Sequence, residues 1–338
     1  MYKKIVIFSL FAGCLAGLIF ATGTESTASA GFQGSDSQPV HPGLNTSSKH
    51  TSFLPIVIEG IERTIYLRFA VIGDYGTGNQ KEADVAALIK SWNPDFIITT
   101  GDNNYPDGAA STIDENIGQF FHEFIAPYKG SYGESGQENR FFPSLGNHDW
   151  HATDVQPYLD YFTLPGNERY YDFYWGAAHF FVLDSDSDEP DGSDSSSVQA
   201  AWLQSQLAAS NSPWKIVYFH HSPYSSGMHG PIERMQWPFA QWGADVVISG
   251  HDHTYERISK DGIYYFVNGL GGAGIYDFNG IIDGSQVRYN EDYGAMLVEV
   301  GREVMRFKFI NRQGVVIDDF ELHQSATISN PQVSQADP

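Results

Sequence analysis

The sequence contains very little cysteine and few positive charges. Its 338 residues include one cysteine, Cys14, and 19 Lys and Arg residues against 41 Asp and Glu residues, which gives a formal net charge of -22 at pH 7. Removal of an N-terminal segment that contains Cys14 would exclude disulfides, cysteine nucleophiles and thiolate zinc sites from the mature chain. A field of this sign repels nucleic acid and anionic membrane surfaces, so we expect no nucleic-acid partner.

The N-terminus carries the pattern of an export signal. The basic start Tyr2-Lys3-Lys4 is followed by an apolar run from Ile5 to about Thr22, and Ala28-Ser29-Ala30 offers a cleavage site. We therefore predict a signal peptide over residues 1–30 and a secreted, periplasmic or cell-surface protein. Two alternatives stay open. Phe11-Ala12-Gly13-Cys14 resembles a lipoprotein acylation site, and the apolar run is close to the ~20 residues that span a bilayer. We expect a stable membrane partner only if this segment is retained or lipidated.

The rest of the chain is typical of one folded α/β domain. Hydrophobic residues make up 41% of the sequence, enough for a large core. Residues 31–64 are rich in small and polar residues and are interpreted as a flexible lead-in, residues 65–323 as the domain, and residues 324–338 as a polar tail. Buried-strand patterns at 67–72 and 95–100 flank a helical pattern at 79–92, which favours parallel strand pairing. Further helices are expected at 113–128, 198–207 and 233–242, with a hairpin over 170–184.

Five short polar fragments, each directly after a strand-like run, carry the chemistry. They are Gly73-Asp74-Tyr75-Gly76, Gly101-Asp102-Asn103-Asn104-Tyr105, Gly146-Asn147-His148-Asp149, His220-His221-Ser222-Pro223 and Gly250-His251-Asp252-His253. Sheets of α/β proteins build their sites at the carboxyl ends of strands. The fragments therefore predict that one group of side chains supplies the ligands of two metal ions.

Each fragment offers particular ligand atoms. Asp74 and Asp102 follow glycines, which tolerate positive φ and let the next side chain point into a crevice. One carboxylate can bridge two ions about 3.5–4 Å apart, and we assign this role to Asp102. Asn147 offers a neutral amide oxygen. His251 and His253 lie on the same face of an extended strand end.

Four histidines have roles that the spacing leaves open. His220 and His221 are adjacent, so only one should face the metals, and the spacing does not decide between them. His148 cannot easily share a metal with Asn147 and is predicted to contact the substrate as an acid or a phosphate donor. His229, in the loop Gly227-Met228-His229-Gly230, is a candidate hydrogen-bond donor to a leaving group.

The fragments resemble those of the purple acid phosphatases within the calcineurin-like metallophosphoesterases, in particular the small single-domain type that includes the tartrate-resistant acid phosphatases. The specific mark is Tyr105 in Gly-Asp-Asn-Asn-Tyr. The resemblance covers about residues 66 to 270. It implies a mixed β-sandwich flanked by helices, in the layer order α/β/β/α.

The resemblance also implies a ligand set and an activity. Fe(III) would be held by Asp74, Asp102, Tyr105 and His253, and a divalent Fe, Zn or Mn ion by Asp102, Asn147, His221 and His251. His221 is chosen because the ligand histidine of the family stands two residues before a proline, here Pro223. His148 and His229 fall where the family keeps its substrate-contacting histidines. The implied substrate is a small phosphate monoester, attacked by hydroxide that forms on the metals because cations lower the pKa of bound water.

Two other functions are compatible with the same fragments. A phosphodiesterase or nucleotide hydrolase of the same superfamily would use two divalent ions and leave Tyr105 idle. A phosphate- or metal-binding surface protein would have lost turnover.

The segment after residue 183 is rich in carboxylates: Asp184, Asp186, Asp188, Asp191 and Asp194. We expect a solvated acidic loop here and not a Ca²⁺ site, because Gly192 does not fall where an EF-hand needs its glycine.

Overall fold

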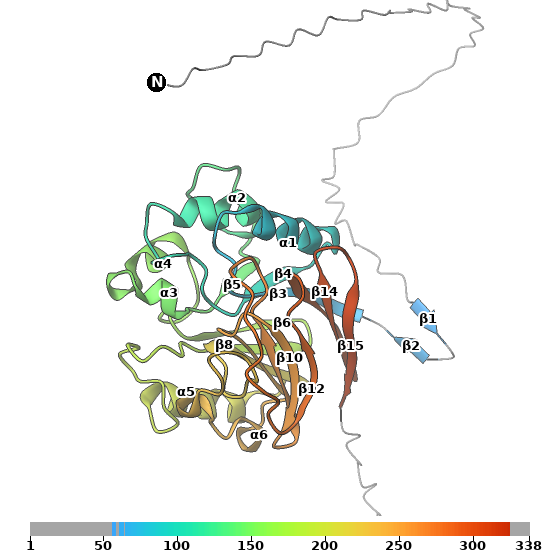
Figure 1. Cartoon of the computed structure of the whole chain (residues 1–338). Coiled ribbons are helices and arrows are strands. Elements are labelled where there is room, and N and C mark those ends of the chain that lie inside the picture. The colour runs from blue at the N-terminus through green and yellow to red at the C-terminus, as the bar shows by residue number, and fades with distance from the viewer. Residues whose placement is uncertain (1–55, 59–60, 64, 325–338) are drawn as a thin grey trace, which may run out of the picture. The chain divides into compact units, whose positions relative to one another are not determined.

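The computed structural model describes residues 56–58, 61–63 and 65–324 (Figure 1). The predicted signal peptide, most of the lead-in and residues 325–338 lie outside the described residues. Within the lead-in, β1 (Ile56–Ile58) and β2 (Ile61–Arg63) pair as an antiparallel hairpin. None of the helices in these described ranges has the length and apolar character needed to cross a lipid bilayer.

A six-stranded mixed sheet contributes the first three polar fragments. In spatial order its strands are β15 (Val316–His323), β14 (Val304–Asn311), β13 (Gly294–Gly301), β3 (Ile65–Ile72), β4 (Phe96–Thr99) and β5 (Phe141–Pro143). The β3, β4 and β5 strands are parallel, and the three C-terminal strands pair antiparallel along the other side of β3. The predicted strand–helix–strand unit over 67–100 is therefore confirmed.

A seven-stranded mixed sheet contributes the other two fragments. In spatial order its strands are β12 (Ser285–Tyr289), β10 (Tyr255–Lys260), β11 (Ile263–Asn268), β9 (Val246–Gly250), β8 (Trp214–His221), β7 (Ala178–Val182) and β6 (Tyr171–Trp175). The four central strands β11, β9, β8 and β7 are parallel. The β6–β7 pair is the hairpin expected over 170–184.

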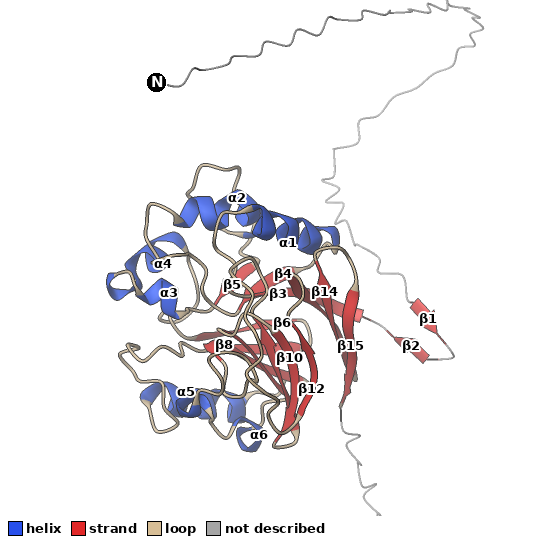
Figure 2. Ribbon diagram, viewed as in Figure 1, coloured by secondary structure: helices blue, strands red, loops and turns tan. Residues whose placement is uncertain are grey.

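Helices cover the outer faces of the two sheets (Figure 2). The α-helices are α1 (Gln80–Ser91), α2 (Gln119–Phe121), α3 (Asn147–Trp150), α4 (Gln156–Tyr161), α5 (Val198–Ala209) and α6 (Phe239–Trp242). Short helical turns are η1 (Asp114–Gly118), η2 (His122–Phe124), η3 (Thr153–Val155) and η4 (Glu233–Met235). Helices α1 and α2 flank the first sheet and α5 and α6 the second (Figure 1), so the predicted α/β/β/α sandwich is confirmed.

Two of the expected helices are shorter than the sequence pattern suggested. The segment 113–128 forms η1, α2 and η2 and leaves helical geometry at Ile125, two residues before Pro127. The segment 233–242 is divided into η4 and α6, because Pro238 has no backbone N–H with which to continue a helix. Helices α1 and α5 keep nearly their expected lengths, and side chains cap both: Asn79 accepts from the amide of Lys81 at 2.8 Å, and Ser197 from that of Ala200 at 3.0 Å.

Aromatic side chains fill the space between the two sheets. Phe180 of the second sheet is fully buried and meets Phe69 and Phe96 of the first sheet edge-on, with ring centroids 5.1 Å and 5.2 Å apart. It also stacks on Phe173 at 4.8 Å. The packing of these rings fixes the relative position of the two sheets and hence of the polar fragments at their strand ends.

We predict that Phe180→Ala destabilises the fold by about 3–5 kcal/mol, since it removes a buried ring and leaves a cavity between the sheets. Denaturant unfolding measures this loss. Tyr132→Ala is the matched control, because that ring is 44% exposed and its loss should change stability by less than about 1 kcal/mol. Equal effects of the two substitutions would contradict this account of the core.

Candidate metal centre

The five polar fragments lie where parallel strands of the two sheets end. Asp74 follows β3, Asp102 follows β4, and Asn147 begins α3 after β5; these are three adjacent parallel strands of the first sheet. His220 lies near the end of β8, and His251 directly follows β9, its parallel neighbour in the second sheet. Both sheets therefore deliver donor atoms to one place.

Unusual backbone geometry turns these side chains into the site. Asp74, Asp102 and His251 have φ values of 53°, 52° and 71°, in the left-handed region that non-glycine residues seldom adopt. The ligand residues thus carry the strained conformation themselves. The glycine before His251 serves a different need: a Cβ at Gly250 would lie 2.5 Å from Oδ2 of Asp74. This close approach explains why the fragment begins with glycine.

Three side chains, Tyr105, His253 and Asp74, form the first half of the donor set, and Tyr105 joins it to Asp102. The Tyr105 hydroxyl donates to Oδ2 of Asp102 at 2.8 Å and lies 3.2 Å from Nε2 of His253. That same Nε2 is 3.4 Å from Oδ1 of Asp74. Nδ1 of His253 bonds the Gly274 carbonyl, so its proton is held there and Nε2 keeps a free lone pair.

The second half of the donor set surrounds His220. Its Nε2 lies 3.0 Å from Oδ1 of Asn147, 3.2 Å from Nδ1 of His251 and 3.4 Å from Oδ1 of Asp102. Its Nδ1 is 2.8 Å from the Thr100 carbonyl, which again fixes the tautomer that leaves Nε2 free. Two imidazole nitrogens and an amide oxygen that face one another in this way suit a shared cation.

Asp102 connects the two halves, as the sequence analysis predicted for a bridging carboxylate. Its Oδ2 faces Tyr105 while its Oδ1 faces His220, and the residue is only 2% exposed. Asp74, Asp102 and His220 place ligand atoms within 4.8 Å of one another. Buried carboxylates, imidazoles, an amide and a phenol converge here, and this donor set fits a pair of metal ions.

The choice of His221 as a ligand needs correction, because the structure places His220 in the donor set. His220 faces Thr100 at the end of β4, and the neighbouring side chain on an extended strand faces the opposite way. His221 consequently meets Ser185 after β7: its Nδ1 is 3.0 Å from the Ser185 hydroxyl, and its amide donates to the same oxygen at 2.9 Å. The spacing to Pro223 was a misleading guide.

His148 and His229 border the donor set, and both are at least partly exposed. The amide of His148 donates to Oδ1 of Asp102 at 2.9 Å, and its Nε2 is 4.0 Å from Oδ2, with the side chain 30% exposed. Nδ1 of His148 is held 2.6 Å from the Pro106 carbonyl. The exposed ring of His229 stacks on that of His251, with centroids 4.2 Å apart. Their predicted roles as substrate contacts remain predictions.

Burial and charge act strongly on these groups. Burial raises the pKa of Asp74, although His220 and His253 act in the opposite direction. Burial also raises the pKa of Tyr105 well above its usual range, and the charge of Asp102 adds to the effect. The pKa of His251 is strongly lowered, first by burial and then by the neighbouring histidines. A neutral imidazole is ready to bind a cation, whereas a tyrosinate requires a cation beside it.

A supporting network behind the ligands was missed by the sequence analysis. The Asn103 side-chain amide donates to Oδ2 of Asp149 at 2.8 Å and to the Ser144 carbonyl at 2.7 Å. The Asn103 side-chain oxygen accepts from the Thr99 hydroxyl at 2.6 Å. Burial raises the pKa of Asp149 to about 7. These bonds tie the end of β4 to the turn before α3. Asn103 and Asp149 lie inside the polar fragments, and that position was the only signal for them.

A second set of bonds holds the loop that carries His229. Asp252 points away from the donor set, and its carboxylate accepts from the Ser225 hydroxyl at 2.5 Å and from the amide of His229 at 2.8 Å. Glu256 accepts from the amide of Ser226 at 2.7 Å and from its hydroxyl at 2.6 Å. The acidic residue between the two histidines therefore positions a loop residue of the site.

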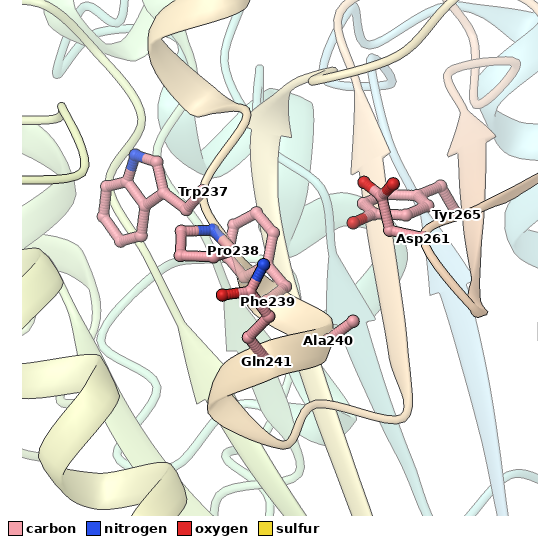
Figure 3. A pocket seen from close by; sticks show the side chains of 7 residues that line it. All are labelled: Trp237, Pro238, Phe239, Ala240, Gln241, Asp261 and Tyr265. Atoms are coloured by element: carbon pink, nitrogen blue, oxygen red, sulfur yellow. The ribbon is translucent and has the colours of Figure 1, made fainter.

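A surface hollow of about 260 Å³ lies elsewhere on the second sheet (Figure 3). It is lined by Trp237, Pro238, Phe239, Ala240, Gln241, Asp261 and Tyr265. None of the predicted ligands lines it, and its single charged side chain is acidic. An anionic substrate would be repelled there, so the chemistry belongs to the strand ends.

Comparison with known proteins agrees with this geometry. The family model of the calcineurin-like phosphoesterases matches residues 67–255, more than half of the chain. A converging set of Asp, Asn and His donors at the strand ends of a mixed β-sandwich fits the metal site of a phosphoesterase. The chain belongs to the calcineurin-like phosphoesterase family and is a hydrolase that acts on phosphate esters.

Curated relatives narrow the likeness to the purple acid phosphatases. Tartrate-resistant acid phosphatase type 5 of Mus musculus is 24% identical over 259 residues, 65% of this chain and 76% of the mouse protein. Purple acid phosphatase 3 of Arabidopsis thaliana is 25% identical over 296 residues, which is 74% of this chain and 75% of the plant protein. The resemblance noted from Tyr105 is thereby confirmed, and the family implies a dinuclear metal centre.

Solved structures share the fold. The structure titled "GAP50 the anchor in the inner membrane complex of Plasmodium" has a TM-score of 0.62 and 22% identity, over 78% of this chain and 90% of that one. Purple acid phosphatase PPD1 from yellow lupin (Lupinus luteus) has a TM-score of 0.58 and 18% identity, over 77% of this chain. This chain covers 54% of the lupin protein. At these identities the likeness supports the fold alone.

Paired substitutions at the two adjacent histidines test the corrected ligand set. We predict that His220→Ala lowers the bound metal by about one ion per chain. The substitution removes one of the three side chains, Asn147, His220 and His251, that form the second half of the donor set. His221→Ala should keep the full metal content, since its ring is bonded to Ser185. Metal analysis of the two purified variants measures this. The reverse pattern, with metal lost only from His221→Ala, would restore the original choice.

Proposed function

We propose that the chain is an exported phosphomonoesterase that uses Fe(III) together with a divalent Fe, Zn or Mn ion. The observation that carries the proposal is the position of the Tyr105 hydroxyl, 2.8 Å from the bridging carboxylate of Asp102 and 3.2 Å from His253. A phenol inside a donor set of carboxylates and imidazoles is a ligand suited to a highly charged ion. Its raised pKa means that only a strong local positive charge would make it a tyrosinate.

Each half of the donor set would hold one of the two ions. Asp74, Tyr105 and His253 would hold Fe(III), and Asn147, His220 and His251 would hold the divalent ion. Asp102 would be shared between them. When bound, two such cations lower the pKa of a coordinated water and offset negative charge on phosphate. They would also reverse, locally, the negative field of a chain whose net charge is -22.

The chain's own residues supply orientation and protons. His148 is anchored through Nδ1 to the Pro106 carbonyl, which directs its Nε2 toward the edge of the site near Asp102. His229 is exposed and held by the bond from its amide to Asp252. Either imidazole can donate a proton or a hydrogen bond to the oxygen of a departing alcohol. We propose a small phosphate monoester as the substrate.

Export is part of the proposal and rests on residues 1–30. The basic start, the apolar run and Ala28-Ser29-Ala30 support cleavage after residue 30. Mass spectrometry of the protein recovered from outside the cell tests it: a mature N-terminus at residue 31 is expected. An acylated Cys14 or an intact first residue would favour the lipidated or anchored alternative.

The proposed function predicts that turnover depends on the shared carboxylate. Asp102→Ala should abolish hydrolysis of p-nitrophenyl phosphate and reduce metal content, because the shared carboxylate of both ions is removed. Asp283→Ala is the matched control: it removes the same charge from a side chain that is 93% exposed and should leave turnover within about twofold, as expected for a surface substitution. Unchanged activity in Asp102→Ala would refute the proposed function.

A second prediction concerns colour and separates this proposal from a hydrolase with two divalent ions. The iron-loaded protein should absorb visible light through a Tyr105–Fe(III) pair, and Tyr105→Phe should remove the band. Tyr276→Phe is the control, because Tyr276 stacks on His253 at 3.9 Å without entering the donor set. A colourless iron-loaded protein, or a band that survives Tyr105→Phe, would favour the rival with an idle tyrosine.

A further inference from the structure

Arg234 stands beside the site with most of its hydrogen-bonding capacity unused. It lies in η4, five residues after His229 along the same loop. Its Nη2 donates to the Ser185 carbonyl at 2.8 Å. Its Nε is buried, and no acceptor for it exists among the described residues. A guanidinium has five N–H donors in a planar fork. Arg234 as a whole is only half-buried, so the Nη N–H groups that Ser185 does not use retain the capacity to bind an anion.

A short series of contacts links Arg234 to the donor set. Ser185, whose carbonyl accepts from Arg234, bonds the amide and Nδ1 of His221 through its hydroxyl. The His221 ring lies 4.5 Å from that of His251, a proposed ligand. The positive charge of Arg234 also contributes to the lowered pKa of His221, after burial and the charge of His220. The guanidinium therefore lies one residue layer beyond the half of the centre assigned to the divalent ion.

Several other buried or half-buried arginines are ion-paired with carboxylates, whereas Arg234 is not. The ion pairs of the chain include Arg68–Glu299, Arg169–Glu189, Arg257–Asp318, Arg306–Asp319 and Arg312–Asp292. Within residues 65–324, no carboxylate oxygen makes such a pair with Arg234.

The nearest acidic groups form no ion pair with it. Burial lowers the pKa of Arg234, while Asp186 and Asp184 act in the opposite direction from beyond ion-pair distance. Burial raises the pKa of Asp184 well above its usual range, so that the neutral acid is favoured. The first part of the acidic loop is in fact buried, with Asp184 fully covered and Asp186 7% exposed, and is not the solvated loop expected from the sequence. An arginine stays protonated in such surroundings.

We propose that Arg234 binds a second anionic group of the substrate, so that the site favours phosphate esters or anhydrides that carry a further phosphoryl group. This inference rests on the proposed phosphatase function. The scissile phosphate would occupy the donor set, and the loop from His229 to Arg234 would extend along the departing part of the molecule. A planar guanidinium forms two parallel hydrogen bonds to a phosphoryl group, which gives both strength and geometric selectivity.

Two substrates that differ in this respect test the inference on the metal-loaded protein. Inorganic pyrophosphate carries a second phosphoryl group, whereas p-nitrophenyl phosphate does not. Arg234→Gln should lower kcat/KM for pyrophosphate by about tenfold or more, mainly through KM, as expected for the loss of a charge-assisted bond. The same variant should change kcat/KM for p-nitrophenyl phosphate by less than about threefold. Arg234→Lys should recover part of the loss, because it restores the charge without the planar fork.

The control is Arg302→Gln, which removes the same charge from the exposed turn between β13 and β14. Gly301 beside it pairs with Ile65, at the end of β3 opposite to the site. Thermal unfolding of each variant shows whether it is folded. An equal loss on both substrates in folded Arg234→Gln would mean that the arginine only supports Ser185 and His221, and would overturn the inference. A wild-type protein that hydrolyses p-nitrophenyl phosphate but not pyrophosphate would also overturn it. Activity on neither substrate would refute the proposed function itself.

Discussion

The structure depends on the burial of two carboxylates, Asp74 and Asp102, at the junction of two sheets. Neither is more than 2% exposed, and two negative charges taken out of water are costly unless positive charge compensates them. Within the described chain the compensation comes from imidazoles, above all His220 and His253. Burial opposes a positive charge on both imidazoles although the carboxylates favour it, and in the neutral form their nitrogen lone pairs face the same space. A pair of bound cations resolves both demands at once, which is why the donor set is better explained as a metal centre than as a hydrogen-bond network.

The packing of the two sheets against each other creates this junction. Each sheet alone presents only part of the donor set at its strand ends, and the aromatic core between the sheets brings the two parts together. Buried polar residues then hold the ligands in place: Asn103 and Asp149 on the first sheet, Asp252 and Glu256 behind the His229 loop. The carbonyls of Thr100 and Gly274 bond the rings of His220 and His253, so the orientation of these two imidazoles is fixed before a metal or substrate arrives. Specificity for a substrate can then arise from loop residues such as Arg234, which lie outside the rigid donor set.

Much of this arrangement was predictable from the sequence. Local patterns identify strands followed by polar fragments, and ligand chemistry predicts Asp74, Asp102, Asn147, His251 and His253 as neighbours. The choice between His220 and His221 was not predictable, because it depends on which face of β8 meets β4, a relation between two sheets that spacing along the chain does not contain. The same applies to Arg234 and to the buried start of the acidic loop. Their environments are set by tertiary contacts with Ser185 and Trp150, for which no local pattern exists.

The central claim is that the buried carboxylates and the imidazoles hold two metal ions, one of them ferric. Metal quantification on the purified wild-type protein, combined with its visible spectrum, tests this most directly. The account predicts close to two ions per chain, at least one of them iron, and a visible absorption band in the oxidised protein. A fully folded protein that binds no metal under metal-replete conditions, or binds two divalent ions with no iron and no band, would contradict it.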